Sequence, residues 1–139
     1  MIKMVNVNHF AVLLAAIAAY VVGFLWYGPI FGKKWMALMG FTEKDKEKVK
    51  QKGMVKMYAG SFLTTLVMAY VLAIFIGFMG YYPTAGIQVG VVTWLGFIAT
   101  TMLGKVFWES KPWALYVLDA GHYLVTLAIM GAILGAWRP

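Results

Sequence analysis

The chain contains no cysteine, which excludes disulfide bonds and thiolate metal sites. It is also poor in charge, because only 12% of its residues are Asp, Glu, Lys or Arg, whereas soluble domains carry about 25%. Acidic residues are the scarcest, with 5 against 12 basic residues. Since 63% of the residues are hydrophobic, the composition indicates a membrane protein rather than a soluble domain.

Long stretches of the chain lack charge altogether. No charged residue occurs from 57 to 104, and a single spanning helix needs about 20 apolar residues, so this run holds two spans. The uncharged residues 4–32 hold one more, and residues 112–137 hold a fourth. We therefore predict one all-α transmembrane domain, residues 1–139, with four spanning helices at residues 9–27, 57–80, 86–107 and 113–137.

The connection from residue 28 to 56 is strongly basic. It carries eight lysines and three acidic residues, for a net charge of +5. The positive-inside rule places such a loop in the cytoplasm, so we expect a multi-pass protein of the cell (inner) membrane with both termini outside. Gly28-Pro29 is expected to end the first helix. Thr42 and Asp45 resemble a capping box, which predicts a short helix from Glu43 to about Lys52.

Lysines of this short helix are also candidates for contact with anionic lipids, although they could simply set the topology. The lipid-contacting candidates are Lys44, Lys46, Lys48, Lys50 and Lys52. Beyond the lipid bilayer and its anionic lipids we expect no nucleic-acid partner, because no basic patch is interleaved with aromatic residues on a soluble module.

Small residues recur at spacings that let helices approach closely. The helix-packing candidates are Ala15, Ala19, Gly23, Gly96, Gly104, Gly131 and Gly135. Two ungapped matches further suggest an internal repeat. Leu-x-x-Ile-Ala-x-x-x-x-Gly begins at Leu14 and at Leu95, and Ala-Gly-x-aromatic-Leu-x-Thr-Leu begins at Ala59 and at Ala120. These matches predict two αα-hairpins related as parallel repeats.

Three sequence blocks resemble a known family. They are Trp26-Tyr27-Gly28-Pro29 with Phe31-Gly32-Lys33-x-Trp35, Lys111-Pro112-Trp113 with Asp119-Ala120-Gly121-His122-Tyr123, and Met130-Gly131-Ala132-Ile133-Leu134-Gly135-x-Trp137. Together they resemble the prokaryotic membrane proteins grouped as domain of unknown function 1761. The resemblance covers nearly the whole chain. It implies a small four-helix membrane protein with no assigned activity.

The fourth span carries the candidate site. Asp119 is the only acidic residue inside an apolar span, and on a helix it shares one face with His122 and Thr126. An acidic residue at the centre of a spanning helix costs about 2.5–3.5 kcal/mol, so protein must shelter it. The candidates for ligand binding or a proton relay are Asp119, His122, Thr126, Tyr123, Ser61 and Thr65.

Two interpretations of this site stay open. In one, Asp119 is neutral or paired with His122, and the polar cluster fixes helix register against Ser61, Thr65 or Thr101. In the other, the cluster belongs to a polar pocket, open to the cytoplasm, that binds a solute or relays protons. Aromatic residues that could line such a pocket are Trp94, Tyr123, Tyr58 and Tyr70.

Enzymatic chemistry is not indicated. No nucleophile accompanies Asp119 and His122, and these two residues supply only two of the ligands that a metal site needs, so we predict no catalytic residue, metal or cofactor. Glu109 is expected to pair with Lys105 or Lys111. The function classes left are a homo-oligomer that binds or conducts a small solute or ion, and a structural or accessory membrane subunit.

Overall fold

The computed structural model describes residues 6–139, and every regular element in this part of the chain is a helix. The elements are α1 (His9–Leu25), the π-helix η1 (Trp26–Ile30), α2 (Gly32–Met39), α3 (Glu43–Gln51), α4 (Met54–Met79), α5 (Pro83–Thr93), the π-helix η2 (Trp94–Ala99), α6 (Thr100–Met102), α7 (Gly104–Phe107) and α8 (Trp113–Ala136). Four of the helical stretches are long and apolar enough to cross a membrane, namely His9–Ile30, Met54–Met79, Pro83–Phe107 and Trp113–Ala136. The predicted all-α fold with four spans is confirmed.

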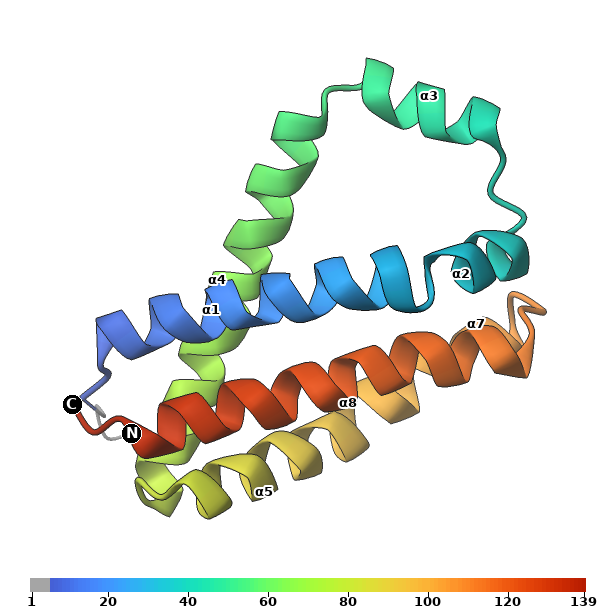
Figure 1. The fold of residues 1–139 in the computed structure, drawn as a ribbon. Coiled ribbons are helices and arrows are strands. Elements are labelled where there is room, and N and C mark those ends of the chain that lie inside the picture. The colour runs from blue at the N-terminus through green and yellow to red at the C-terminus, as the bar shows by residue number, and fades with distance from the viewer. Residues whose placement is uncertain (1–5) are drawn as a thin grey trace.

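α8 is the central helix of the bundle (Figure 1). It runs antiparallel between α1 on one side and α5 on the other, while α4 crosses α1 steeply. In the most apolar window of α8, 44% of the residues are buried, against 28% or less in the other three spans. The helix that carries Asp119 is therefore the one that the remaining helices surround.

The helix ends follow from local sequence. The Asn8 side chain accepts hydrogen bonds from the backbone N–H groups of Phe10 and Ala11 and so caps α1. Pro83 occupies the first turn of α5, where a missing N–H costs nothing. Gly80 ends α4 at a φ of 118°, a backbone conformation that a residue with a Cβ atom adopts only with strain.

The predicted end of the first helix at Gly28-Pro29 is wrong. The chain instead continues through one π-helical turn, in which the Phe31 N–H donates to the Trp26 carbonyl at 2.8 Å. Pro29 has no N–H, and its ring would clash with the carbonyl four residues earlier in an α-helix. The wider π turn accommodates the ring, so the first span extends to Ile30.

The short helix in the basic loop forms as predicted. Thr42 and Asp45 make a reciprocal capping box at the start of α3. The Thr42 backbone N–H and hydroxyl donate to Asp45, each at 2.9 Å, and these bonds hold the pKa of that carboxyl below its ordinary value, with a smaller contribution from Lys48. α2 was not predicted. It ends at Gly40, whose φ of 67° reverses the chain toward α3.

The tightest helix contact joins α5 to α8. Gly86 lies against Gly131, Gly90 lies against the Leu127 carbonyl, and Gly135 lies against the Tyr82 carbonyl. A Cβ atom added at any of these glycines would overlap the facing backbone. The absence of side chains is what lets the two helices approach so closely.

The contact between α1 and α4 is made by alanines. Ala11, Ala15 and Ala19 of α1 are buried in one core with Ala69 and Ala73 of α4. Larger side chains complete this core, namely Val12, Leu72, Ile76, Leu127, Met130 and Leu134. Toward α3, the N-terminal half of α4 stands away from α1 and α8 (Figure 1), and its residues from 55 to 61 are all exposed.

Several packing candidates lie elsewhere than expected. No side chain or neighbouring helix lies within 4 Å of a Cβ atom built at Gly96, and at Gly104 only Trp108 is reached, at 4.0 Å. These two glycines therefore mediate no helix contact within the described residues. Gly131 and Gly135 do lie at a helix contact, but the two glycines that α5 contributes to this contact, Gly86 and Gly90, were not predicted from the sequence. The internal repeat stays a prediction. The two helix pairs that it relates differ in packing, since α5–α7 and α8 form a close hairpin whereas α1 and α4 cross.

Candidate functional site

Asp119 is buried, with 6% of its surface exposed, and both of its carboxylate oxygens have partners. The Tyr27 hydroxyl donates to Oδ1 at 2.7 Å. The Lys105 ammonium lies 4.0 Å from Oδ2, at the end of the third span, where the lysine side chain is 45% exposed. Tyr27 comes from η1 and Lys105 from α7, so the two neighbouring helices both hold Asp119. Because the Tyr27 hydroxyl donates to a carboxylate, this hydrogen bond is stronger than one between two neutral groups.

One of the two options for Asp119, pairing with His122, does not occur. The side chains share a face of α8, but among residues 6–139 neither ring nitrogen of His122 has a hydrogen-bond partner. Lys105 pairs with Asp119, and among residues 6–139 Glu109 forms an ion pair with neither Lys105 nor Lys111, which corrects the expected pairing of Glu109. The partners of the Asp119 carboxylate thus come from helices other than α8.

Two tryptophans bind the backbone of α8 on either side of Asp119. Trp26 Nε1 donates to the Leu118 carbonyl at 3.1 Å, and Trp94 Nε1 donates to the Ala120 carbonyl at 2.7 Å. Each of these tryptophans is the first residue of a π-helical turn. A carbonyl oxygen has two lone pairs, so these bonds add to the helical ones. They fix the rotation of α8 and so the direction in which Asp119 and His122 point.

His122 lies among aromatic rings. Its ring centroid is 4.9 Å from that of Tyr27 and 4.8 Å from that of Tyr123, and the Trp26 ring lies at 6.2 Å. Both ring nitrogens are buried without a partner in the described chain, and so is Thr126 Oγ1, one helical turn further along α8. A buried polar group without a hydrogen bond costs about 1–3 kcal/mol, so these atoms favour a bound molecule beside them.

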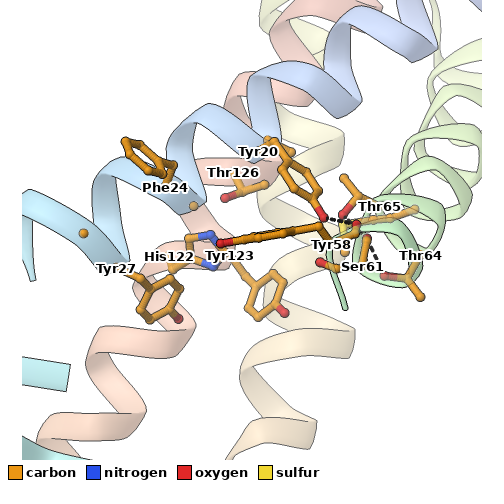
Figure 2. Close-up of a pocket in the computed structure, with 14 residues that line it drawn as sticks. Tyr20, Phe24, Tyr27, Tyr58, Ser61, Thr64, Thr65, His122, Tyr123 and Thr126 are labelled. Atoms are coloured by element: carbon orange, nitrogen blue, oxygen red, sulfur yellow. Dashed lines mark hydrogen bonds between the residues drawn. The ribbon is translucent and has the colours of Figure 1, made fainter. Parts of the chain in front are cut away.

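The residues that carry these atoms, His122 and Thr126, line a cavity of about 580 Å³ between α1, α4 and α8 (Figure 2). The α1 side contributes small and aromatic residues, while the α4 side contributes hydroxyl groups. The lining residues are Ala19, Tyr20, Gly23, Phe24, Tyr27, Gly28, Tyr58, Ser61, Thr64, Thr65, Met68, His122, Tyr123 and Thr126. The volume falls in the range of about 300–1,000 Å³ that is usual for small-molecule sites.

The cavity exists because only part of the small-residue face of α4 packs against α1. Ser61, Thr65, Ala69 and Ala73 share one helical face. Ala69 and Ala73 are buried against α1, whereas Ser61 and Thr65 line the cavity. The hydroxyl groups of Thr64 and Thr65 donate to the Ser61 carbonyl at 2.8 and 2.9 Å, which leaves their oxygen lone pairs available.

Five of the six predicted site residues meet at this cavity, namely His122, Tyr123, Thr126, Ser61 and Thr65. Asp119 does not line it but reaches it through Tyr27. Tyr58 lines the cavity as suggested, and in Figure 2 its ring extends from α4 toward His122. Trp94 binds α8 on another face, Tyr70 accepts or donates a 2.6 Å bond with His9, and Thr101 bonds to its own helix.

Sequence reasoning missed Tyr27, Trp26 and Lys105 as site residues. The helix end expected at Gly28-Pro29 placed the two aromatic residues at the edge of the first span, away from Asp119. The π turn instead keeps them at the depth of Asp119. A signal existed in the chain: a buried carboxylate requires donors, and Lys105 is the only charged residue within the predicted third span, residues 86–107.

No group of three or more His, Cys, Asp or Glu side chains in residues 6–139 lies close enough together to hold a metal ion. His9 bonds with Tyr70 in another part of the bundle, away from His122. The five candidate lipid-contacting lysines, residues 44, 46, 48 and 50 of α3 and Lys52 at its C-terminal cap, are all exposed.

Four apolar helices around a buried, charge-paired carboxylate define a small multi-pass membrane protein, and its spanning region contains a cavity lined by aromatic rings and a few hydroxyl groups. The family model described as "Protein of unknown function (DUF1761)" matches residues 10–135. The chain therefore belongs to this family. No curated protein and no solved structure matches it.

Proposed function

We propose that the protein binds a small solute in the cavity beside His122, within the membrane-spanning region. The observation that carries this proposal is the placement of unpartnered polar atoms. Thr126 is only 3% exposed, its hydroxyl has no partner in the described chain, and it lines the cavity together with His122. A purely structural cluster would satisfy these groups internally, since hydrogen bonding inside the protein is the rule for buried polar atoms.

Asp119 contributes to binding without touching the solute. Its carboxylate accepts from Tyr27, which leaves the lone pairs of the tyrosine oxygen available at the cavity wall. Because Tyr27, Lys105 and the two tryptophans all hold the region around Asp119, the site is rigid on its α8 side. Binding or passage of a solute, rather than its chemical conversion, is what these groups can perform.

The topology that we propose has the basic loop in the cytoplasm and both termini outside. The Asn8 side chain donates to the Arg138 carbonyl at 3.1 Å, and the Tyr81 hydroxyl donates to the Asn6 carbonyl at 2.9 Å. Both ends of the chain and the turn between α4 and α5 therefore lie at one end of the bundle. The net charge of +5 lies in the connection at the other end. Single cysteines introduced at Ser110 and at Thr84 would be labelled by a membrane-impermeant reagent in intact cells only at Thr84.

The exposed lysines of α3 support a proposal of contact with anionic lipid. Each lysine near an anionic surface contributes about 1 kcal/mol. Replacing Lys44, Lys46 and Lys48 together by Gln is expected to reduce the anionic lipid that remains bound after purification. Unchanged retention of anionic lipid would show that these lysines act on topology alone.

Native mass spectrometry of protein released from lipid tests the proposed binding. Wild type is compared with the double variant His122→Phe, Thr126→Val and with the control Thr101→Val, whose hydroxyl bonds within its own helix. A non-phospholipid adduct on wild type and control, absent from the double variant, supports binding. Identical spectra with lipid adducts only would contradict it and would favour the structural or accessory subunit. The same spectra report whether the protein is a homo-oligomer.

A further inference from the structure

We infer that the solute of the His122 cavity is an uncharged planar ring bearing oxygen, a phenol or a quinone, that enters from the bilayer between α1 and α4. This inference rests on the proposed function and names the chemical class of its ligand. Four features of the cavity carry it: the charge of its lining, the aromatic surfaces, the free hydrogen-bonding atoms and the direction of its opening.

The lining offers no counter-charge. Of the fourteen residues around the cavity, none is Lys, Arg, Asp or Glu. Asp119, which accepts from the cavity-lining Tyr27, is itself paired with Lys105. An ion brought out of water to this depth would lose its hydration without gaining a partner. The cavity therefore favours an uncharged ligand over an organic cation or anion.

Ring-shaped side chains occupy several walls of the cavity. Tyr20, Phe24 and Tyr27 come from the α1 side, Tyr58 from α4, and Tyr123 and His122 from α8. Aromatic rings associate through offset or edge-to-face contacts with centroids about 4.5–7 Å apart. His122 already makes such contacts with Tyr27 and Tyr123. A flat ring in the open part of the cavity can extend the same arrangement.

The free polar atoms match oxygen substituents on such a ring. A neutral imidazole presents one donor and one acceptor, and a threonine hydroxyl both donates and accepts. His122 and Thr126 lie on one face of α8 with these capacities unused within the described chain. A carbonyl oxygen can accept from them, and a phenolic hydroxyl can accept and donate. An acyl chain of a phospholipid has neither kind of atom.

The cavity opens toward the bilayer. Phe24, at its edge on α1, is 75% exposed, and Tyr58, at its edge on α4, is 58% exposed. Val55 and Leu63 of the same half of α4 are also exposed, so apolar side chains lie beside the opening. A phosphate headgroup stays at the membrane surface, whereas His122 lies about two and a half helical turns in from Trp113. A ring molecule dissolved in the bilayer reaches this depth without crossing water.

Binding of defined probes to the protein in discs of synthetic phosphatidylcholine tests the class. The probes share one short alkyl chain and differ in the headgroup: a hydroquinone, a benzoquinone, a trimethylammonium and a sulfate. Affinity is read from the rise in unfolding temperature with probe concentration. The hydroquinone or the benzoquinone is expected to bind at least tenfold more tightly than either charged probe. Which of the two binds better shows whether the site prefers a hydroxyl or a carbonyl oxygen.

Variants separate the site from simple partition into lipid. Thr126→Val is expected to weaken binding of the preferred ring probe about tenfold, since tenfold corresponds to 1.4 kcal/mol, within the range for one hydrogen bond. Thr101→Val is expected to leave it unchanged. Equal binding of a charged probe, or equal binding by wild type and Thr126→Val, would overturn the inference. If no ring probe binds while native mass spectrometry still shows a site-dependent adduct, the class is wrong and the proposed function stands.

Discussion

On one side of α8, helix α5 packs through glycines along the contact, whereas on the other side α1 and α4 meet through alanines and then diverge. The glycine contact brings backbones together and leaves no space for a ligand. The alanine contact ends where Ser61 and Thr65 replace alanine on α4, and the cavity begins there. Small residues thus have two effects in this bundle. Glycines bring α5 and α8 into close contact, and the small residues of α1 and α4 leave room for the cavity beside their contact.

The largest expected effect comes from breaking the closed contact. Gly131→Leu places a side chain into the backbone of α5 at Gly86, so the helices must separate. Overpacking of a close contact costs about 1–3 kcal/mol and more where backbone has to move, and we expect a loss of about 3 kcal/mol or more. Gly96→Leu is the matched control, because no side chain or neighbouring helix lies within 4 Å of its Cβ position. Unfolding in detergent measures both variants, and equal stability would refute the glycine contact.

A smaller effect is expected at the carboxylate. Tyr27→Phe removes the hydroxyl that donates to Asp119 and leaves Lys105 as its only remaining partner in the described chain. Hydrogen bonds to charged groups contribute about 1.5–3 kcal/mol, so a loss in that range is expected. Tyr82→Phe, at an exposed tyrosine outside the site, serves as the control. The hydrogen bond would be unimportant if thermal unfolding of the two variants coincided.

On the open side, removing a polar atom is expected to stabilise the empty protein. Thr126→Val replaces a buried hydroxyl that has no partner among residues 6–139 by a methyl group of similar size. The cost of the unpartnered group disappears, and a gain of about 1 kcal/mol follows. The measurement is chemical unfolding in synthetic detergent, without added ligand. A loss of stability instead would mean that Thr126 makes an internal hydrogen bond.

The smallest effect lies outside both contacts, at the capping box of α3. The pKa of Asp45 is lowered in the folded protein by bonds from Thr42, so its charged form stabilises the helix above the ordinary carboxyl pKa of about 4. This stabilisation is lost as the pH falls below that value through the lowered pKa. Circular dichroism of wild type and Asp45→Asn should differ at neutral pH and converge in acid. A constant difference at every pH would contradict the cap.

The four spans could be predicted from sequence because charge-free runs and the thickness of the bilayer leave one solution. The shared face of Asp119, His122 and Thr126 followed from helical spacing alone. The sequence did not show which glycines of the third span contact α8. Gly86 and Gly96 both lie in this apolar span, but only Gly86 lies where α5 packs against α8. Lipid is as apolar as a partner helix, so the sequence carries no burial signal that distinguishes them.

The partners of Asp119 were beyond sequence for a different reason. The rule that proline ends a helix placed Tyr27 at the last position of the first span. A single π turn preserves the helix past Pro29 and delivers Tyr27 to Asp119. Such turns depend on tertiary packing and have no reliable signature in a single sequence, although they often occur at functional sites.

The most direct test of the central claim is ¹⁵N spectroscopy of the histidine rings. The chain has two histidines, and His9 serves as an internal reference because it is bonded to Tyr70. The spectra compare discs cut directly from cell membranes with discs of synthetic phospholipid. If the cavity holds a solute, the His122 nitrogens show hydrogen-bonded shifts in the native discs that change in synthetic lipid, while those of His9 stay constant. Identical His122 shifts in both discs, at the position of an imidazole free of hydrogen bonds, would contradict the claim.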